Sequence, residues 1–368
     1  MALEVRIDHV PNGAGWDLKL KRTVSTEHLR AGSRPLAIIP GYGMNAFIFG
    51  YHPSGFSMEE FFARRGFEVW SLFLRKQRGT RRRGGTNRFG MAEVAITDLR
   101  AAFDHIASAT TTGGDRIDSI GCSLGGSYQY IHASLVPENK MGAIVSIGSP
   151  LAWTSVHPLI KRLFANPRIV GSIPFVFSSH LAELGFPLLK RFPKVLRIYV
   201  HPEITDTSKI STLVKTIEDP VPQINREIAE WIRKRDLVLS GRNVTRAMQH
   251  VKNPLLVVVA NRDGIVPEST VMSAFEASGA TMKDVLRVGT DVLHFAHADL
   301  FISRHSHELV FEPIAAWLEK VNGVRANAAG NAMKKVSRKV KPAGSRPATR
   351  PSSGPGSRKG ARASRPRP

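Results

Sequence analysis

The sequence has almost no cysteine, no long apolar run and, over residues 334–368, no acidic side chain. Cys122 is the single cysteine, which excludes an intramolecular disulfide framework and a cysteine-based metal site. No stretch approaches the roughly 18 apolar residues of a spanning helix, and the nearest candidate, residues 169–189, is broken by prolines, His180 and Glu183. A transmembrane segment is therefore not expected.

The positive charge is concentrated at one end of the chain. The 52 Lys and Arg residues outnumber the 30 Asp and Glu residues, but twelve of the basic ones lie within residues 334–368. From Gly323 onward the composition reduces to small, basic and proline residues, which cannot bury enough apolar surface to fold. We expect residues 324–368 to be a disordered basic tail, either without a dedicated partner or in weak contact with anionic membrane or nucleic acid.

Two features favour a cytoplasmic location. The first ten residues carry charges throughout and contain no apolar core of a secretory signal. A single cysteine also suits a reducing compartment. The sequence indicates no oligomeric state.

Alternating strand and helix patterns predict an α/β fold. Alternation in residues 3–10 and 16–24, on either side of a Gly-rich turn, predicts an antiparallel hairpin. Further buried strands and amphipathic helices then alternate along the chain. These expected elements are strands at 35–39, 67–74, 116–121, 142–148, 254–260 and 285–289, and helices at 91–108, 124–135, 268–278 and 307–321. The alternation predicts a mostly parallel central sheet with helices on both faces.

Residues 151–250 interrupt this alternation with a proline-containing helical block. We therefore expect one α/β core in two parts, residues 1–150 and 251–323. A helical cap at 151–250 is inserted between these parts, and the tail follows at 324–368. The apolar and aromatic residues of the cap suit a hydrophobic ligand, although cap helices also need them simply to pack on the core.

Ser123 lies in a Gly-x-Ser-x-Gly motif between a predicted strand and a predicted helix. Gly121 and Gly125 permit a sharp turn that lifts the hydroxyl above the sheet edge, which suits a nucleophile. The alternative is that the glycines only let the helix pack close to the strand. Cys122 is out of frame, because Ile120 stands where its own glycine would be needed, and we interpret it as a buried flank of the turn.

A serine nucleophile needs a base and an acid that orients the base. Asp263 follows a buried strand, 140 residues after Ser123, and His297 lies 34 residues further on. His294 is an alternative base. Asp299 is expected to support the loop or cap the following helix, and is a weaker alternative acid; Asp263 itself could be a plain turn aspartate.

These motifs together resemble the α/β-hydrolase family. "IIPGYG" (38–43) is similar to its oxyanion segment, "GCSLGG" (121–126) to its nucleophile turn, "NRDGIVPES" (261–269) to its acid turn and "HADLFIS" (297–303) to its histidine motif. The resemblance extends over about residues 36–320 and is closest to the lipase, esterase and polyhydroxyalkanoate-synthase-like branches. It implies the α/β-hydrolase fold with an inserted cap.

The resemblance also assigns roles to individual residues. It implies Ser123, His297 and Asp263 as a catalytic triad, with His297 favoured because His297-Ala298-Asp299 matches the histidine motif. The backbone N–H groups of Tyr42 and Leu124 would form the oxyanion hole, and Pro40, where the family usually has histidine, leaves backbone donors intact. No metal or organic cofactor is needed.

The function expected from this resemblance is a serine esterase or lipase-like hydrolase acting on a small-molecule or lipid ester. The alternatives are an acyltransferase or polyhydroxyalkanoate-metabolism enzyme with the same triad, and a non-catalytic binding protein. Polyhydroxyalkanoate synthases use a cysteine nucleophile, so Ser123 favours hydrolysis. Residues 75–88 carry seven basic side chains, which either steer anionic substrates, contact anionic membrane or nucleic acid, or form a solvated loop.

Overall fold

The computed structural model describes residues 2–170, 196–208 and 210–323. The chain divides into two compact units, Met1–Arg325 and Ala326–Pro368, and only the first contains described residues. The basic tail expected at 324–368 and most of the apolar cap segment 169–196 lie outside the described residues.

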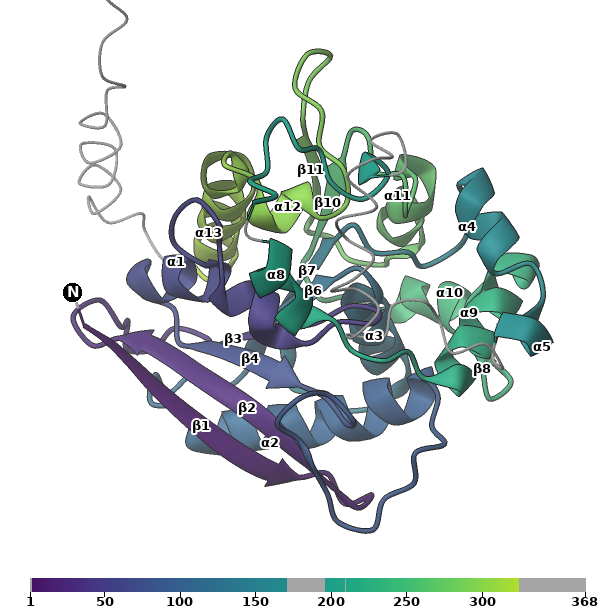
Figure 1. The fold of residues 1–368 in the computed structure, drawn as a ribbon. Helices are drawn as coiled ribbons and strands as arrows, with labels where there is room; N and C mark the ends of the chain where they lie inside the picture. The colour runs from purple at the N-terminus through teal and green to yellow at the C-terminus, as the bar shows by residue number, and fades with distance from the viewer. Residues whose placement is uncertain (1, 171–195, 209, 324–368) are drawn as a thin grey trace, which may run out of the picture. The chain divides into compact units, whose positions relative to one another are not determined.

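The described unit is built on one large sheet whose strand order is β1-β2-β4-β3-β6-β7-β10-β11, with β5 pairing to β2 (Figure 1). Every neighbouring pair from β4 to β11 is parallel, whereas β1 and β2 are antiparallel. The expected hairpin and the mostly parallel sheet are therefore confirmed. The strands of this sheet are β1 (Leu3–Pro11), β2 (Trp16–Ser25), β3 (Leu36–Ile39), β4 (Val69–Phe73), β5 (Arg81–Arg82), β6 (Ile117–Cys122), β7 (Met141–Ile147), β10 (Leu255–Ala260) and β11 (Lys283–Val288).

Helices cover both faces of the sheet, and the strands are apolar on both sides. In β10, Leu255, Val257 and Val259 join one hydrophobic cluster while Leu256 and Val258 join the other, as the two-residue period of a strand requires. The first cluster includes side chains of α2 (Leu99–Ala109) and α3 (Leu124–Leu135), and the second those of α1 (Met58–Arg64) and α13 (Glu312–Val321).

Two of the predicted helices begin with π-helical turns. The segment expected as a helix at 91–108 opens with η2 (Glu93–Asp98) before α2, and that expected at 307–321 opens with η5 (His307–Phe311) before α13. The chain also forms η1 (Ala46–Gly50) and α1, which the sequence patterns did not predict. The remaining helices of the core are α11 (Glu268–Ala277) and α12 (Asp299–Ile302).

The region expected as a cap is helical where it is described. Its helical elements are α4 (Pro158–Leu163), α5 (Pro167–Val170), α8 (Ile210–Leu213), η3 (Val214–Thr216), α9 (Pro222–Lys234), α10 (Val244–Ala247) and η4 (Met248–His250). It also contains a two-stranded hairpin of β8 (Val238–Leu239) and β9 (Arg242–Asn243), which the sequence did not predict.

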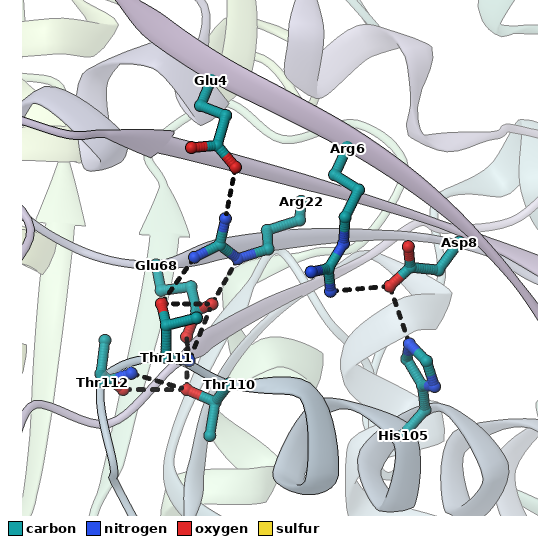
Figure 2. Close-up of polar contacts among 9 residues, drawn as sticks. All are labelled: Glu4, Arg6, Asp8, Arg22, Glu68, His105, Thr110, Thr111 and Thr112. Carbon is teal, nitrogen blue, oxygen red and sulfur yellow. Dashed lines mark hydrogen bonds and ion pairs between the residues drawn. The ribbon is translucent and has the colours of Figure 1, made fainter.

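A buried ion pair fastens the hairpin to the core (Figure 2). Arg22 of β2 donates to Glu68 at 2.5 Å, and both side chains are almost fully buried. Glu68 also accepts hydrogen bonds from Thr110 and Thr111, which follow α2. Removing one partner of such a pair leaves an uncompensated buried charge, which typically costs about 3–5 kcal/mol.

A second polar contact in Figure 2 joins β1 to α2. Asp8 accepts hydrogen bonds from Arg6 at 2.9 Å and from His105 at 2.8 Å. The edge strand is thus held by side chains as well as by its pairing with β2. Within the described part of the chain, no helix is both long and apolar enough to cross a lipid bilayer.

Candidate active site

The candidate site lies where the order of the parallel strands reverses. From β3 the chain passes through α1 to β4 on one side, and β6 later pairs with the other side of β3. Open α/β sheets bind ligands beyond the carboxyl ends of the strands at such a switch point. Two of the predicted functional turns follow these strands, one after Ile39 of β3 and the other after Cys122 of β6.

Ser123 occupies a strained backbone conformation between β6 and α3, with φ 54° and ψ −122°. This region of φ is unfavourable for a residue with a side chain and is often found at active sites. A Cβ on Gly125 would lie 2.3 Å from the carbonyl oxygen of Ile39, and one on Gly121 would lie 2.6 Å from Cα of Gly126. The glycines of the motif therefore allow α3 to begin against β3 and β6.

Cys122 does not compete with Ser123 as a nucleophile in this geometry. Its side chain is fully buried within the hydrophobic cluster on the α1 and α13 face of the sheet. Burial raises the pKa of the Cys122 thiol well above its usual value. A thiol in this environment is structural, because the reactive form is the thiolate.

The two predicted oxyanion donors flank Ser123. Leu124 is the first residue of α3, so its N–H has no acceptor within the helix. Gly41 packs against the nucleophile turn so closely that a Cβ there would lie 2.9 Å from Cβ of Ser123. Tyr42 follows directly, and its amide makes no backbone hydrogen bond to another described residue. Both N–H groups are therefore available to a ligand.

Asp263 and His297, the predicted acid and base, are hydrogen-bonded to each other. His297 Nδ1 donates to Asp263 Oδ2 at 2.6 Å, and both side chains are nearly inaccessible to solvent. The other carboxylate oxygen, Oδ1, accepts from the backbone N–H groups of Ile265 and Val266 at 2.8 and 2.9 Å. This arrangement fixes the carboxylate in its turn, and the hydrogen bond from Nδ1 leaves Nε2 as the ring nitrogen that does not face Asp263.

Gly148 lies between this pair and Ser123, and the sequence patterns did not single it out. Cys122 pairs with Ile147 in the sheet, so Ser123 and Gly148 follow neighbouring strand ends, and Ser123 N–H donates to the Ile147 carbonyl at 2.8 Å. A Cβ on Gly148 would lie 3.1 Å from Cε1 of His297. His297 thus packs on the strand end beside Ser123, although no hydrogen bond joins its imidazole to the Ser123 hydroxyl.

The alternative base, His294, points elsewhere. Its Nε2 donates to the Asp291 carbonyl at 3.0 Å, and its ring lies 6.0 Å from that of His201. It makes no hydrogen bond with Asp263. Of the two candidate histidines, only His297 is paired with the candidate acid.

Asp299 supports the histidine loop, which is the role that the sequence analysis favoured over that of an alternative acid. Its buried carboxylate accepts hydrogen bonds from the N–H groups of Ala296 and His201 and from Thr205 Oγ1, at 2.8, 3.0 and 2.6 Å. Burial raises the pKa of Asp299 to about 7, in opposition to these hydrogen bonds. It makes no hydrogen bond with His297.

Residues 196–205, which return from the cap region, contact both loops of the acid–base pair. Ala298 N–H donates to the Tyr199 carbonyl at 2.8 Å, and Gly264 N–H donates to the Ile198 carbonyl at 3.2 Å. Residues 196–205 therefore brace the acid turn and the histidine loop. No local sequence pattern indicates these contacts, since they depend on how a distant segment folds back.

Residues 216–225 brace the predicted oxyanion turn in the same way. Asn45 N–H donates to the Thr216 carbonyl at 2.8 Å, and Glu218 N–H donates to the Gly43 carbonyl at 2.9 Å. The Tyr42 hydroxyl also donates to Asn225 Oδ1 on α9 at 2.6 Å. The turn that carries the candidate oxyanion donor is consequently held by residues far along the chain. Among residues 2–170, 196–208 and 210–323, no cluster of acidic, histidine or cysteine side chains is arranged to hold a metal ion.

Comparison with known proteins gives matches in three dimensions only. No protein-family model and no curated sequence matches the chain. A carboxylesterase structure from Nitrososphaera gargenis has a TM-score of 0.58 at 16% identity, covering 86% of this chain and 99% of its own. An esterase from Thermogutta terrifontis has a TM-score of 0.57 at 17% identity, covering 86% and 99%. An esterase from Pyrococcus furiosus has a TM-score of 0.55 at 14% identity, covering 87% and 92%.

These neighbours, together with the strand order and the turn after β6, define the class of fold. The chain has the α/β-hydrolase fold, which confirms the fold implied by the sequence resemblance. Nothing in the comparisons distinguishes the polyhydroxyalkanoate-synthase-like branch. At these identities the shared property is the fold, and activity has to be argued from the site itself.

Proposed function

We propose that this protein is a serine hydrolase that cleaves carboxylic esters through Ser123, His297 and Asp263. The observation that carries the proposal is the 2.6 Å hydrogen bond from His297 Nδ1 to Asp263 Oδ2, which lies beside the strained Ser123 at the switch point of the sheet. Each group would have the role that its chemistry permits in a Ser-His-Asp triad.

The first half of the reaction forms an acyl-enzyme. His297 Nε2 takes the Ser123 proton as Oγ attacks the ester carbonyl carbon, and Asp263 stabilises the resulting imidazolium. The carbonyl oxygen becomes an oxyanion that accepts hydrogen bonds from the amides of Tyr42 and Leu124. Collapse of this intermediate breaks the bond to the alcohol oxygen, which leaves with the proton from His297.

The second half repeats these roles with water. His297 takes a proton from water, whose oxygen attacks the acyl carbon, and then returns the proton to Ser123 as the carboxylic acid leaves. An acyltransferase would differ only in using another hydroxyl or a thiol in place of water. Hydrolysis is the simpler proposal, because it needs no second binding site.

The substrate that we propose is a lipophilic ester. A cavity of about 50 Å³ adjoins the oxyanion turn. Its lining combines the oxyanion turn and several apolar and aromatic side chains with polar and charged ones. The apolar and aromatic residues are Tyr42, Leu74, Phe89, Val94, Tyr128, Val221 and Ile224, and the polar and charged residues are Arg75, Lys76, Gln77, Glu218 and Asp219. The apolar part of this lining, next to Tyr42, favours an uncharged acyl or alkyl group.

The test is hydrolysis of p-nitrophenyl esters of increasing acyl length by wild type and variants. We expect activity that varies with chain length and falls by about 10³-fold or more in Ser123→Ala and in Asp263→Asn, because each change removes part of one proton-transfer unit. His294→Ala is the matched control and should retain activity. Near-zero rates for every ester, or undiminished rates in Ser123→Ala, would contradict the proposal.

Three further expectations stay predictions. They are a cytoplasmic location, a weak contact of the basic tail with anionic membrane or nucleic acid, and the division of residues 151–250 as a cap. A non-catalytic binding role is less well supported, since a buried acid–base pair beside a strained serine has no evident purpose in a binding protein.

A further inference from the structure

The loop between β4 and α2 presents an exposed basic surface. Residues 75–88, called the basic loop here, contain seven Lys and Arg residues and no acidic residue. Arg75 is buried and structural, because it donates to Asp98 at 2.6 Å. The other six basic side chains are all exposed: Lys76, Arg78, Arg81, Arg82, Arg83 and Arg88.

The basic loop is held in place along its length. Near its start, Gln77 Nε2 donates to the Met44 carbonyl at 2.9 Å. In its middle, β5 pairs with β2, and Gly85 N–H donates to the Gly15 carbonyl at 2.9 Å. Just beyond its end, Met91 N–H donates to the Glu227 carboxylate at 2.7 Å. Its exposed charges are therefore displayed on an anchored backbone.

At least half of the six exposed cationic side chains make no polar contact inside the described part of the protein. The side chains of Lys76, Arg81 and Arg88 make no hydrogen bond or ion pair with any described residue, whereas Arg83 pairs with Asp17 at 2.8 Å. The resulting positive potential reaches His9 of β1. The pKa of His9 is lowered first by burial and second by the charge of Arg81. Unpaired like charges held together cost folding free energy, so they call for an anionic partner.

The basic loop also adjoins the candidate active site. Lys76 and Gln77 line the same cavity as Tyr42 of the oxyanion turn. Glu218 bridges the two segments, since its carboxylate accepts from the Arg78 N–H at 2.7 Å and from Asn45 Nδ2 at 2.5 Å. A partner bound to the basic loop would therefore lie next to the cavity that adjoins the predicted oxyanion turn.

We propose that the basic loop is a docking surface for an anionic lipid bilayer. Six exposed cations spread along thirteen residues, 76–88, suit a surface of many phosphate headgroups better than a single small anion. A nucleic-acid role is less favoured, because the loop has no aromatic side chain to stack on bases and the adjoining Phe89 is buried. This inference goes beyond the proposed function, since docking does not need Ser123.

The experiment uses the full chain with a fluorescent reporter on the loop. The native Cys122 is fully buried, so an environment-sensitive dye will attach selectively to Asn87→Cys, an exposed position in the loop. A second protein carries the dye at Val292→Cys, which is 93% exposed in another loop. Each is titrated with vesicles of phosphatidylcholine alone or with about 30% phosphatidylglycerol, at about 0.1 M salt.

We expect the dye at position 87 to shift to shorter wavelength with anionic vesicles, and neither dye to respond to neutral ones. The triple variant Lys76→Gln, Arg81→Gln, Arg88→Gln should bind anionic vesicles with a partition coefficient on the order of 100-fold lower than that of wild type. Each charge contributes about fivefold, and the three contributions multiply. Ser123→Ala should bind as wild type does, which separates this proposal from the hydrolase proposal.

The matched control removes the same charge elsewhere, through Lys252→Gln, Arg304→Gln and Lys320→Gln, all exposed outside the loop. The proposal fails if this control weakens binding as much as the loop variant does. It also fails if vesicles bind while the emission of the dye at position 87 does not shift, since the tail alone would then be responsible. A response of that dye to a single-stranded oligonucleotide but not to anionic vesicles would assign the loop to nucleic acid instead.

Discussion

At the scale of single residues, the candidate site depends on close approaches of backbone that only glycine permits. Gly121 and Gly125 were recognisable in the sequence because their spacing around Ser123 forms a motif. Gly148 was not, because its importance comes from the His297 ring that a loop nearly 150 residues later places against it. A residue whose role depends on a distant neighbour cannot be inferred from local spacing.

Gly148→Ala tests whether that approach positions His297. Gly148 has φ +58°, and an added Cβ would lie 3.1 Å from His297 Cε1 and 3.3 Å from Asp263 Oδ2. We expect kcat for ester hydrolysis to fall by about 10-fold, because the added Cβ moves the imidazole by a few tenths of an ångström, and a displacement of about 1 Å in a catalytic group can cost about 10²-fold. The measurement is steady-state kinetics on a p-nitrophenyl ester.

The matched control is Gly113→Ala. Gly113 has φ +78° but nothing within 4 Å of an added Cβ. Both variants should lose about 1–2 kcal/mol of stability from the left-handed backbone conformation, as measured by denaturation. Only the Gly148 variant should also show a lower kcat. Equal kcat values for the two variants would refute the role of Gly148 in positioning His297.

At the scale of secondary-structure elements, the strongly patterned strands and helices were predicted well and the irregular ones were not. The π-helical turn η2 has a tertiary cause that the helical spacing of residues 91–108 does not contain: the Ala95 carbonyl accepts a hydrogen bond from His132 Nδ1 of α3 at 2.7 Å. His132 is 1% exposed, and burial lowers its pKa to about 4.

His132→Asn should flatten the dependence of stability on pH. The unfolded chain takes up a proton on His132 near pH 6.5. The native protein resists this down to about pH 4. The free energy of unfolding therefore falls as pH falls through this window. The Asn amide keeps a hydrogen-bond donor but cannot titrate. As the pH falls, the free energy of unfolding of the variant should therefore decrease less steeply than that of wild type, by up to about 1.4 kcal/mol per pH unit.

Urea denaturation at several pH values between 7.5 and 4 measures this difference, with the pH values chosen on both sides of the histidine transition. His250→Asn, at an exposed histidine, is the matched control and should follow the wild-type curve. Parallel curves for wild type and His132→Asn would show that burial of this histidine has no effect on stability.

At the scale of the whole molecule, the alternation of strands and helices predicted a mostly parallel sheet, and the resemblance of four motifs, in order, to the α/β-hydrolase family predicted the particular fold. The same order predicted that Asp263 and His297 meet. It did not predict how residues 196–205 and 214–218 brace the site, since those contacts follow from long-range packing. The assignment of 151–250 as a cap stays a prediction.

The central claim is that Ser123 is the activated nucleophile of this fold, and it is tested most directly with a fluorophosphonate probe and peptide mapping by mass spectrometry. The serine hydroxyl should become covalently phosphonylated only where His297 and Asp263 activate it. We predict one adduct on the folded protein, located on Ser123, absent from Ser123→Ala and retained in Cys122→Ala. Absence of any adduct on the folded wild-type protein, or labelling that survives Ser123→Ala, would contradict the account.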